Sequence, residues 1–184
     1  MKVVHLVLLL ATTLIFVGVF NTANAAMYSM PKNMKAVKAG DDVYIVFQAT
    51  NKTSNEDDIY LTSSHDGGKK YTTINLSNGK ALLNESGPVD LKASFNPQVA
   101  VDKEGDAYVA WNANSSGGQQ YIVLDISKDK FATPGIPVVN MTSMNGNKPA
   151  SEPLLIKDET SGAINLYYLA GPDGPQDPCK TRCG

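Results

Sequence analysis

The sequence predicts an all-β fold, and more specifically part of a β-propeller built from four-stranded antiparallel blades. Two observations support this prediction. Short spans of alternating apolar residues are separated, about every ten residues, by clusters of Gly, Asn, Asp, Pro and Ser, which is typical of many short strands. The strand-like segments also recur in the same order with a period of about 60 residues, the length expected of one propeller blade.

The N-terminus has the pattern of a secretory signal. Lys2 provides a positive start, Val3–Phe20 is almost continuously apolar, and Ala23-Asn24-Ala25 fits a cleavage site. We therefore expect residues 1–25 to be removed, residues 26–32 to lead into the fold, and the protein to be secreted or displayed at the cell surface. An uncleaved N-terminal anchor is the alternative; after cleavage we expect no stable membrane span.

Two segments of the repeat match at nearly the same offset. Asp42–Phe47 corresponds to Asp106–Trp111 with an offset of 64 residues, and Ile59–Ser64 corresponds to Ile122–Ser127 with an offset of 63. A third copy begins at Asn165–Ala170, where Tyr167 follows Tyr108 by 59 residues. The predicted blades are residues 33–84, residues 96–139, and a partial third blade at residues 152–170.

Closed propellers contain four to eight blades, whereas the repeats cover about two and a half. We therefore expect an N-terminal fragment, or a truncated copy, of a longer protein. Its partners would include the remaining blades, or another chain that completes the ring.

One turn of the first repeat carries a recognisable motif. Residues Ser64 to Tyr71 read Ser-His-Asp-Gly-Gly-Lys-Lys-Tyr, which resembles the Asp box, Ser-x-Asp-x-Gly-x-x-aromatic, of the sialidase-like (BNR-repeat) propellers. The carboxylate can accept backbone hydrogen bonds across the turn, and glycine permits a positive φ. The second repeat keeps only part of the pattern. The predicted structural residues are Ser64, Asp66, Gly68 and Tyr71 in the first box and Ser127, Asp129 and Phe131 in the degenerate one.

The resemblance implies a fold that has six blades when complete, and in that family the Asp box is a folding device on the outer edge of the blade. The Asp box therefore supports the assignment of a propeller fold and does not imply catalysis. Sialidases bind the carboxylate of sialic acid with three arginines, and Lys does not reproduce their bidentate geometry. Arg182 is the sole arginine of this chain, so no arginine triad can form here. We assign no catalytic residue.

The remaining polar features exclude several functions. The formal net charge of −2 is too weak to indicate a nucleic-acid partner. His65 is the only histidine after the signal, so a metal site is not expected. No residue pattern indicates a cofactor, and none is expected. The acidic cluster Asn55–Asp58 is interpreted as a solvated loop or, at most, a weak calcium site.

Glycosylation and disulfide formation remain open from the sequence. The tail, residues 171–184, is rich in turn formers and is predicted to be irregular. Cys179 and Cys183 in it could form a small disulfide or pair with other segments. Five Asn-x-Ser/Thr sequons are possible N-glycosylation sites: Asn51, Asn75, Asn84, Asn114 and Asn140.

Two functions from different classes fit these features. The favoured hypothesis is a non-catalytic secreted or surface module that binds glycan or protein, or contributes to the cell envelope. The alternative is part of an exo-glycosidase of the sialidase superfamily, with most of its catalytic residues in blades absent from this sequence.

Overall fold

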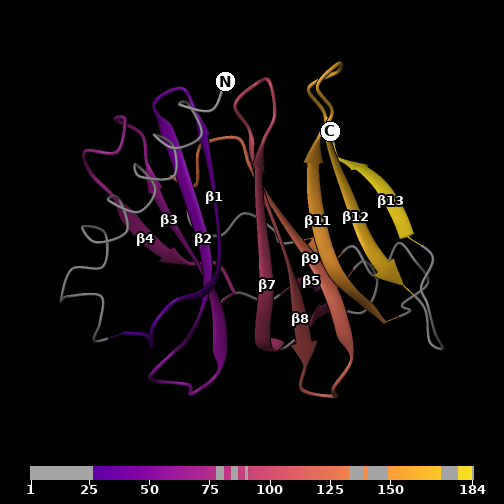
Figure 1. Ribbon diagram of the computed structural model, residues 1–184. Coiled ribbons are helices and arrows are strands. Elements are labelled where there is room, and N and C mark those ends of the chain that lie inside the picture. Colours follow the sequence, from indigo (N-terminus) through magenta and orange to yellow (C-terminus); the bar gives the residue numbers. More distant parts are fainter. Residues whose placement is uncertain are drawn as a thin grey trace, which may run out of the picture.

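A computed structural model describes residues 27–77, 81–83, 87–89, 91–132, 139–140, 149–170 and 178–183. For residues 81–83, 87–89, 139–140, 170 and 178–183 the description concerns the backbone alone. The predicted signal segment and the sequon at Asn84 lie outside these residues. The described chain folds into three sheets of thirteen strands with no helix, which confirms the all-β prediction (Figure 1).

Blade one is a four-stranded antiparallel sheet in the order β1-β2-β3-β4. The strands follow each other in sequence because each connection is a short turn, and β1 and β2 are joined by Gly40-Asp41 alone, with Gly40 at φ 60°. Such a turn needs a positive φ that glycine adopts without strain. The strands are β1 (Lys32–Ala39), β2 (Asp42–Thr50), β3 (Asp57–Ser64) and β4 (Thr72–Asn75).

Blade two is a six-stranded sheet in the order β6-β5-β10-β9-β8-β7. The sequence assigns residues 81–83 to the end of the first blade, but β5 pairs with β10 in parallel at Leu82 and Val139. The first blade therefore ends at β4, and the short β5–β6 hairpin extends the outer edge of the second. The strands are β5 (Ala81–Leu83), β6 (Gly87–Val89), β7 (Leu91–Val101), β8 (Ala107–Ser115), β9 (Gln120–Ser127) and β10 (Val139–Asn140).

Blade three is the antiparallel sheet β11-β12-β13, formed by Ala150–Lys157, Ile164–Ala170 and Pro178–Cys183. The prediction of an irregular tail is wrong for residues 178–183, because β13 pairs with β12 along its whole length. In an extended strand the Cα atoms of Cys179 and Cys183 are separated by about 13 Å. A disulfide requires about 4.4–6.8 Å, so the strand and a Cys179–Cys183 disulfide exclude each other.

The predicted repeat is present in the strand pairing. β2 and β3 correspond to β8 and β9, as the matched segments indicate. In the third copy the correspondence is displaced by two residues: β12 begins at Ile164, 57 residues after the start of β8 at Ala107, and Tyr167 takes the place of Ala110. A slip of two residues leaves the alternation of buried and exposed positions unchanged, so the sequence pattern does not detect it.

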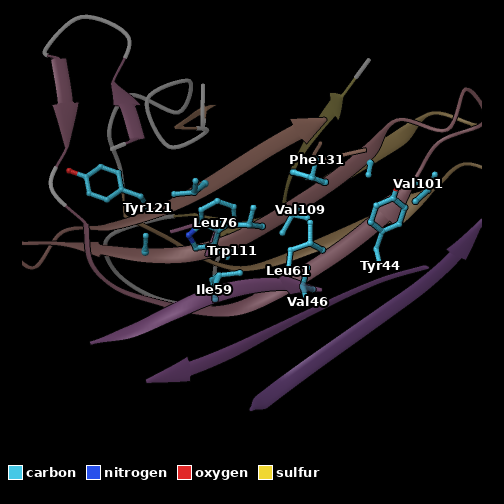
Figure 2. Close-up of a cluster of buried hydrophobic side chains, with 13 residues drawn as sticks. Tyr44, Val46, Ile59, Leu61, Leu76, Val101, Val109, Trp111, Tyr121 and Phe131 are labelled. Atoms are coloured by element: carbon cyan, nitrogen blue, oxygen red, sulfur yellow. The ribbon is translucent and has the colours of Figure 1, made fainter. Parts of the chain in front are cut away.

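The blades stack face to face and bury apolar side chains between them. Between blades one and two, Tyr44, Ile59 and Leu61 meet Val109 and Trp111, all of them almost inaccessible to solvent (Figure 2). A second cluster fills the space between blades two and three: Ala100, Tyr108, Ala110, Ile122, Leu124, Ala150, Ile164, Leu166 and Tyr168. Blade two supplies alternate residues to its two neighbours, as expected of stacked blades.

Candidate functional site

One edge strand of each blade contains a β-bulge with a left-handed residue. Asn33 in β1, Asn96 in β7 and Glu152 in β11 all have φ 53°, and the strand register shifts around each of them. β7 contacts both β1 and β11, so the three bulged strands lie side by side where the blades meet (Figure 1). A bulge re-aims a side chain and interrupts pairing, and bulges are frequent next to active sites.

The bulge conformation is energetically costly for these residues. A non-glycine residue in the left-handed region costs on the order of 1–2 kcal/mol; Asn tolerates it better than Glu because its short side chain can hydrogen-bond locally. In Asn96-Pro97 and Glu152-Pro153 the following proline is buried and further restricts the preceding residue. Strain that recurs at equivalent positions indicates a constraint beyond folding, and it identifies these three residues as a candidate site.

A side chain from the neighbouring blade holds the backbone of Glu152. Asn112 in β8 is fully buried; its Nδ2 donates to the carbonyl oxygen of Ala150 at 3.2 Å, and its Oδ1 accepts from the amide of Glu152 at 3.2 Å. The side-chain amide of Asn112 thus hydrogen-bonds to two backbone groups at the bulge of β11. The position of Glu152 is therefore fixed across the interface between blades two and three.

The side chains at the three bulges differ in charge and exposure. Glu152 and Asn33 are exposed, whereas Asn96 is half-buried. Asn33 Nδ2 donates to Gln48 Oε1 at 2.8 Å, and Gln48 Nε2 donates to Asp57 Oδ2 at 2.7 Å. Glu152 supplies the one carboxylate among the three positions. The bulges thus present two amides and one acid: all three can hydrogen-bond to hydroxyl groups, and the acid alone can transfer a proton.

The turn between β3 and β4 has the hydrogen bonds expected of its motif. Ser64 Oγ donates to Asp66 Oδ1 at 2.8 Å and accepts from the amide of Gly68 at 2.9 Å. Asp66 Oδ1 also accepts from the amides of Lys69 and Lys70 at 2.9 and 3.0 Å. The amide of Lys70, followed by Ser64, lowers the pKa of Asp66. Tyr71 is half-buried, with its hydroxyl against Gly68.

The turn after β9 reproduces this arrangement without glycine. Ser127 Oγ donates to Asp129 Oδ1 at 2.8 Å and accepts from the amide of Phe131 at 2.6 Å. Phe131 therefore occupies the position of Gly68 in the hydrogen-bond pattern, as the offset of 63 residues between the repeats indicates, and not the aromatic position of the motif. Lys130 and Phe131 keep positive φ values of 61° and 60°. Burial of Phe131 in the core between blades one and two offsets the strain of this backbone.

The two turns and the bulges lie at opposite ends of the blades. In blade one, Ser64 pairs with Val43 at the start of β2, whereas the bulge at Asn33 lies beside Gln48, five residues further along β2. Five residues of strand span about 17 Å. The assignment of the turns to the Asp box stays a prediction, and their position separates them from the candidate site.

The acidic cluster Asn55–Asp58 is divided: Asn55 and Glu56 lie in the connection before β3, whereas Asp57 and Asp58 lie in β3 and are not part of a solvated loop. Asp57 accepts hydrogen bonds from Lys32, Gln48 and Thr50; burial raises its pKa, and these hydrogen bonds outweigh burial and lower it. Asp58 accepts from Asn51, Asn75 and Ser77 at 2.7–3.0 Å. Within the described residues no group of three or more His, Cys, Asp or Glu side chains is arranged to hold a metal ion.

The predicted glycosylation residues occupy different environments. The amides of Asn51 and Asn75 both donate to Asp58 Oδ2 and are half-buried. Asn114, in β8, is half-buried, and its Oδ1 is buried with no hydrogen-bond partner. Asn140 is described by its backbone in β10.

No family model and no curated protein sequence matches the chain. Solved structures do. An endo-arabinase from Bacteroides thetaiotaomicron VPI-5482 matches with a TM-score of 0.53 and 14% identity, over 84% of this chain and 56% of that one. The Hadza microbial sialidase Hz136 matches with a TM-score of 0.54 and 12% identity, over 85% of this chain and 32% of that one. Both are β-propeller glycoside hydrolases.

The chain has the fold of a partial β-propeller. It spans about half the length of the endo-arabinase and a third of the sialidase. In the part of the chain that the structure describes, no helix is long and apolar enough to cross a bilayer.

Sequence reasoning did not identify the three bulge residues. The available signal was the recurrence of a polar residue before Met or Pro at the same place in each bulged strand: Asn33-Met34, Asn96-Pro97 and Glu152-Pro153. This recurrence is recognisable only when the third copy is aligned in the register that the structure shows.

Proposed function

We propose that the chain is part of a carbohydrate-active β-propeller of the glycoside hydrolase type, and that its inner-strand bulges contact a glycan. Two findings support this proposal. The solved structures that it resembles are named as enzymes that act on carbohydrates. Its own polar bulge residues gather on adjacent inner strands, where propellers enclose a central channel. The glycosidase alternative derived from the sequence is thereby favoured over the non-catalytic module.

The observation that carries the proposal is the geometry of Glu152. Its side chain is exposed, its backbone is strained, and a buried amide from the neighbouring blade holds that backbone in place. A carboxylate held by a rigid sheet is the preorganised acid or base that glycoside hydrolysis requires. We propose that Glu152 is one of the two carboxyl groups of such a site.

Glycoside hydrolysis uses a second carboxyl group, separated from the first by about 5–5.5 Å for retention and by about 6.5–9.5 Å for inversion. The equivalent residues Asn33 and Asn96 are amides. We propose that the second carboxylate comes from outside the three bulges, and that these amides bind sugar hydroxyl groups.

The same set of side chains also supports a second candidate function. A site with two amides and one carboxylate suits a non-catalytic glycan-binding propeller, because amides bind hydroxyl groups without performing chemistry. A substrate with a carboxylate, such as a sialoside, suits neither the enzyme nor the binding module, because Arg182 is the sole guanidinium in this sequence. We propose a neutral glycan, for which arabino-oligosaccharides are the first choice.

We further propose that the protein acts outside the cell, after cleavage that leaves Ala26 as the N-terminus. This proposal depends on the signal pattern of residues 1–25. N-terminal sequencing of protein recovered from the medium tests it; a chain that still begins at Met1 would indicate an anchor.

The proposed function is tested with the chain and two matched variants. Titration calorimetry with arabino-oligosaccharides, xylo-oligosaccharides and a sialoside measures binding, and the corresponding aryl glycosides measure hydrolysis. Glu152→Gln should reduce hydrolysis, or binding if the module is non-catalytic, at least tenfold. Glu104→Gln, an exposed carboxylate on the turn between β7 and β8, should leave both unchanged.

Hydrolysis lost with binding retained in Glu152→Gln would establish the enzyme. Binding without hydrolysis in the unmodified chain would establish the binding module. Absence of binding to every glycan, or binding that is indifferent to Glu152, would refute the proposed site.

A further inference from the structure

A chain of hydrogen bonds runs from the bulge of blade one to a carboxylate in β3. Asn33 Nδ2 donates to Gln48 Oε1 at 2.8 Å, and Gln48 Nε2 donates to Asp57 Oδ2 at 2.7 Å. Lys32 Nζ and Thr50 Oγ1 also donate to this carboxylate, at 3.0 and 2.7 Å. Gln48 is only 6% exposed, whereas the Asn33 side chain is exposed. The chain therefore begins at a buried anchor and ends at a surface that a ligand can reach.

The charge of Asp57 fixes the direction of every hydrogen bond in this chain. Burial raises the pKa of Asp57, but the hydrogen bonds that it accepts outweigh burial and lower the pKa, so the group is ionised at neutral pH. An ionised carboxylate only accepts hydrogen bonds, so the Gln48 atom beside it must be the nitrogen. The oxygen of Gln48 then faces Asn33, and the Asn33 atom beside that oxygen must also be the nitrogen. The chain thus leaves Asn33 Oδ1 as the end of the amide that faces away from it.

Asn33 differs in this respect from the other two bulge residues. Among the described residues no group donates to Asn33 Oδ1, and the side chains of Asn96 and Glu152 have no hydrogen-bond partner. A hydrogen bond thus sets the orientation of Asn33 alone. Donation from Gln48 to a carboxylate also polarises the two amides in turn, which makes each oxygen a stronger acceptor. An acceptor that is already oriented costs little side-chain entropy when a ligand binds.

We propose that Asn33 Oδ1 is a fixed hydrogen-bond acceptor that selects a glycan by one hydroxyl group, which must donate to it. The inference rests on the proposed function and names the group that the glycan has to present at blade one. A hydroxyl group meets this demand by turning its hydrogen toward the oxygen. A fluorine atom or a methoxy oxygen cannot donate and leaves the acceptor unsatisfied. Gln48 and Asp57 act through Asn33 and are positioning residues.

Titration calorimetry with fluorinated sugars tests the proposal. The probes are arabinobiose and xylobiose, each with one hydroxyl group at a time replaced by fluorine, which is similar in size but cannot donate. In the better-binding series, fluorine at one position should weaken binding to the unmodified chain about tenfold, the loss expected for one hydrogen bond to an oriented acceptor.

Three variants separate Asn33 from other causes of this loss. Asn33→Gly keeps the left-handed backbone without the acceptor, so the loss should disappear. In Asp57→Asn an amide that can donate as well as accept lies beside Gln48, so the chain can reverse and the loss should fall to about threefold or less. Asp58→Asn changes the neighbouring carboxylate, on the opposite face of β3, and should keep the full loss.

A second measurement determines the direction of the chain without any glycan. In isotope-labelled protein, a scalar coupling across the hydrogen bond should connect Asn33 Nδ2 with the side-chain carbonyl carbon of Gln48. A coupling in the reverse direction, from Gln48 Nε2 to the side-chain carbonyl carbon of Asn33, would overturn the proposal.

The titrations distinguish failure of this proposal from failure of the proposed function. Glycan binding that tolerates fluorine at every position, or a loss that persists in Asn33→Gly, would overturn the role of Asn33 and leave glycan binding intact. A loss that disappears in Asp58→Asn as well would attribute the effect to the folding of β3 and overturn the proposal. Absence of binding to every glycan would refute the proposed function and this inference with it.

Discussion

Lys130 Nζ of blade two lies 2.9 Å from Asp42 Oδ2 of blade one. The other carboxylate oxygen, Asp42 Oδ1, lies 2.9 Å from His65 Nδ1. One carboxylate at the start of β2 thus joins the turn of its own blade to the turn of the next. The two turns that the sequence singled out as local folding devices are therefore linked through Asp42 across the interface between the blades.

The Asp42–Lys130 pair should contribute modestly to stability. The Lys130 side chain is half exposed, so Lys130→Ala is expected to cost less than about 1 kcal/mol, and the cost should decrease as salt is added. Lys128→Ala, an exposed residue of the same turn, should cost nothing measurable. Urea unfolding at low and high salt measures both. An equal loss in the two variants would exclude a specific pair.

The same pair predicts a dependence on pH. Burial raises the pKa of Asp42, but hydrogen bonds from Lys130 and His65 outweigh it, and the pKa lies below its ordinary value of 3.8. A lowered pKa in the folded state contributes stability above pH 3.8 that is lost as the pH falls through the folded pKa. Asp42→Asn should therefore remove part of the acid-induced loss of stability. Urea unfolding between pH 2 and 6 measures it, and an unchanged slope would contradict the assignment.

The contribution of Asp125 to folding stability should depend on pH in the opposite direction to that of Asp42. Asp125 is 5% exposed, its Oδ1 has no hydrogen-bond partner, and burial raises its pKa to about 6. A raised pKa gives a contribution that is complete below pH 3.8 and is lost as the pH rises through about 6. Two pKa units correspond to about 3 kcal/mol, so Asp125→Asn should be more stable than the unmodified chain at pH 7.5 by up to that amount.

The control for Asp125→Asn is Asp41→Asn, which changes an exposed carboxylate near the start of β2. Urea unfolding at pH 7.5 compares the two variants, and Asp41→Asn should not gain the stability that Asp125→Asn gains. If Asp125→Asn destabilises the chain at pH 7.5, the carboxylate has a partner that compensates for its burial.

The two turn serines should be equally important although one turn has lost its glycines. Ser64 and Ser127 are buried, and each accepts a hydrogen bond from a backbone amide that has no other partner in the turn. Ser64→Ala and Ser127→Ala should each cost about 1–3 kcal/mol, the penalty of an unsatisfied buried donor. The exposed Ser116→Ala should cost nothing measurable. Thermal melting compares the three variants, and a neutral Ser127→Ala would show that the second turn has lost this function.

Asn112 should keep the backbone of the bulge in β11 well ordered. In Asn112→Ala the amide of Glu152 and the carbonyl group of Ala150 lose their partner, at a cost of about 2–3 kcal/mol. Hydrogen exchange should accelerate at the Glu152 amide more than in the rest of β11. Gln48→Ala removes the equivalent residue of blade one and should leave that amide protected. Uniform acceleration over blade three would mean that Asn112 stabilises the blade as a whole.

The repeat was predictable from sequence because it depends on local alternation. Asp42–Phe47 and Asp106–Trp111 carry the same in–out pattern. The first lies in β2 and all of the second except Asp106 lies in β8, and each of these strands pairs with the bulged strand of its blade. The left-handed conformation of Glu152 was not predictable, since Glu has no intrinsic preference for it and the supporting Asn112 lies 40 residues away. β13 was missed because its strand state depends on pairing with β12, whereas its own sequence follows a segment rich in turn formers.

The hydrogen bonds of Asn112 have a consequence for the blade as a transferable unit. Blade three contains Glu152, but the amide that sets its backbone belongs to blade two. A recombination event, or a designer who exchanges single blades between propellers, would therefore move the acid without the group that positions it. The smallest portable module that keeps this acid in place is a pair of adjacent blades.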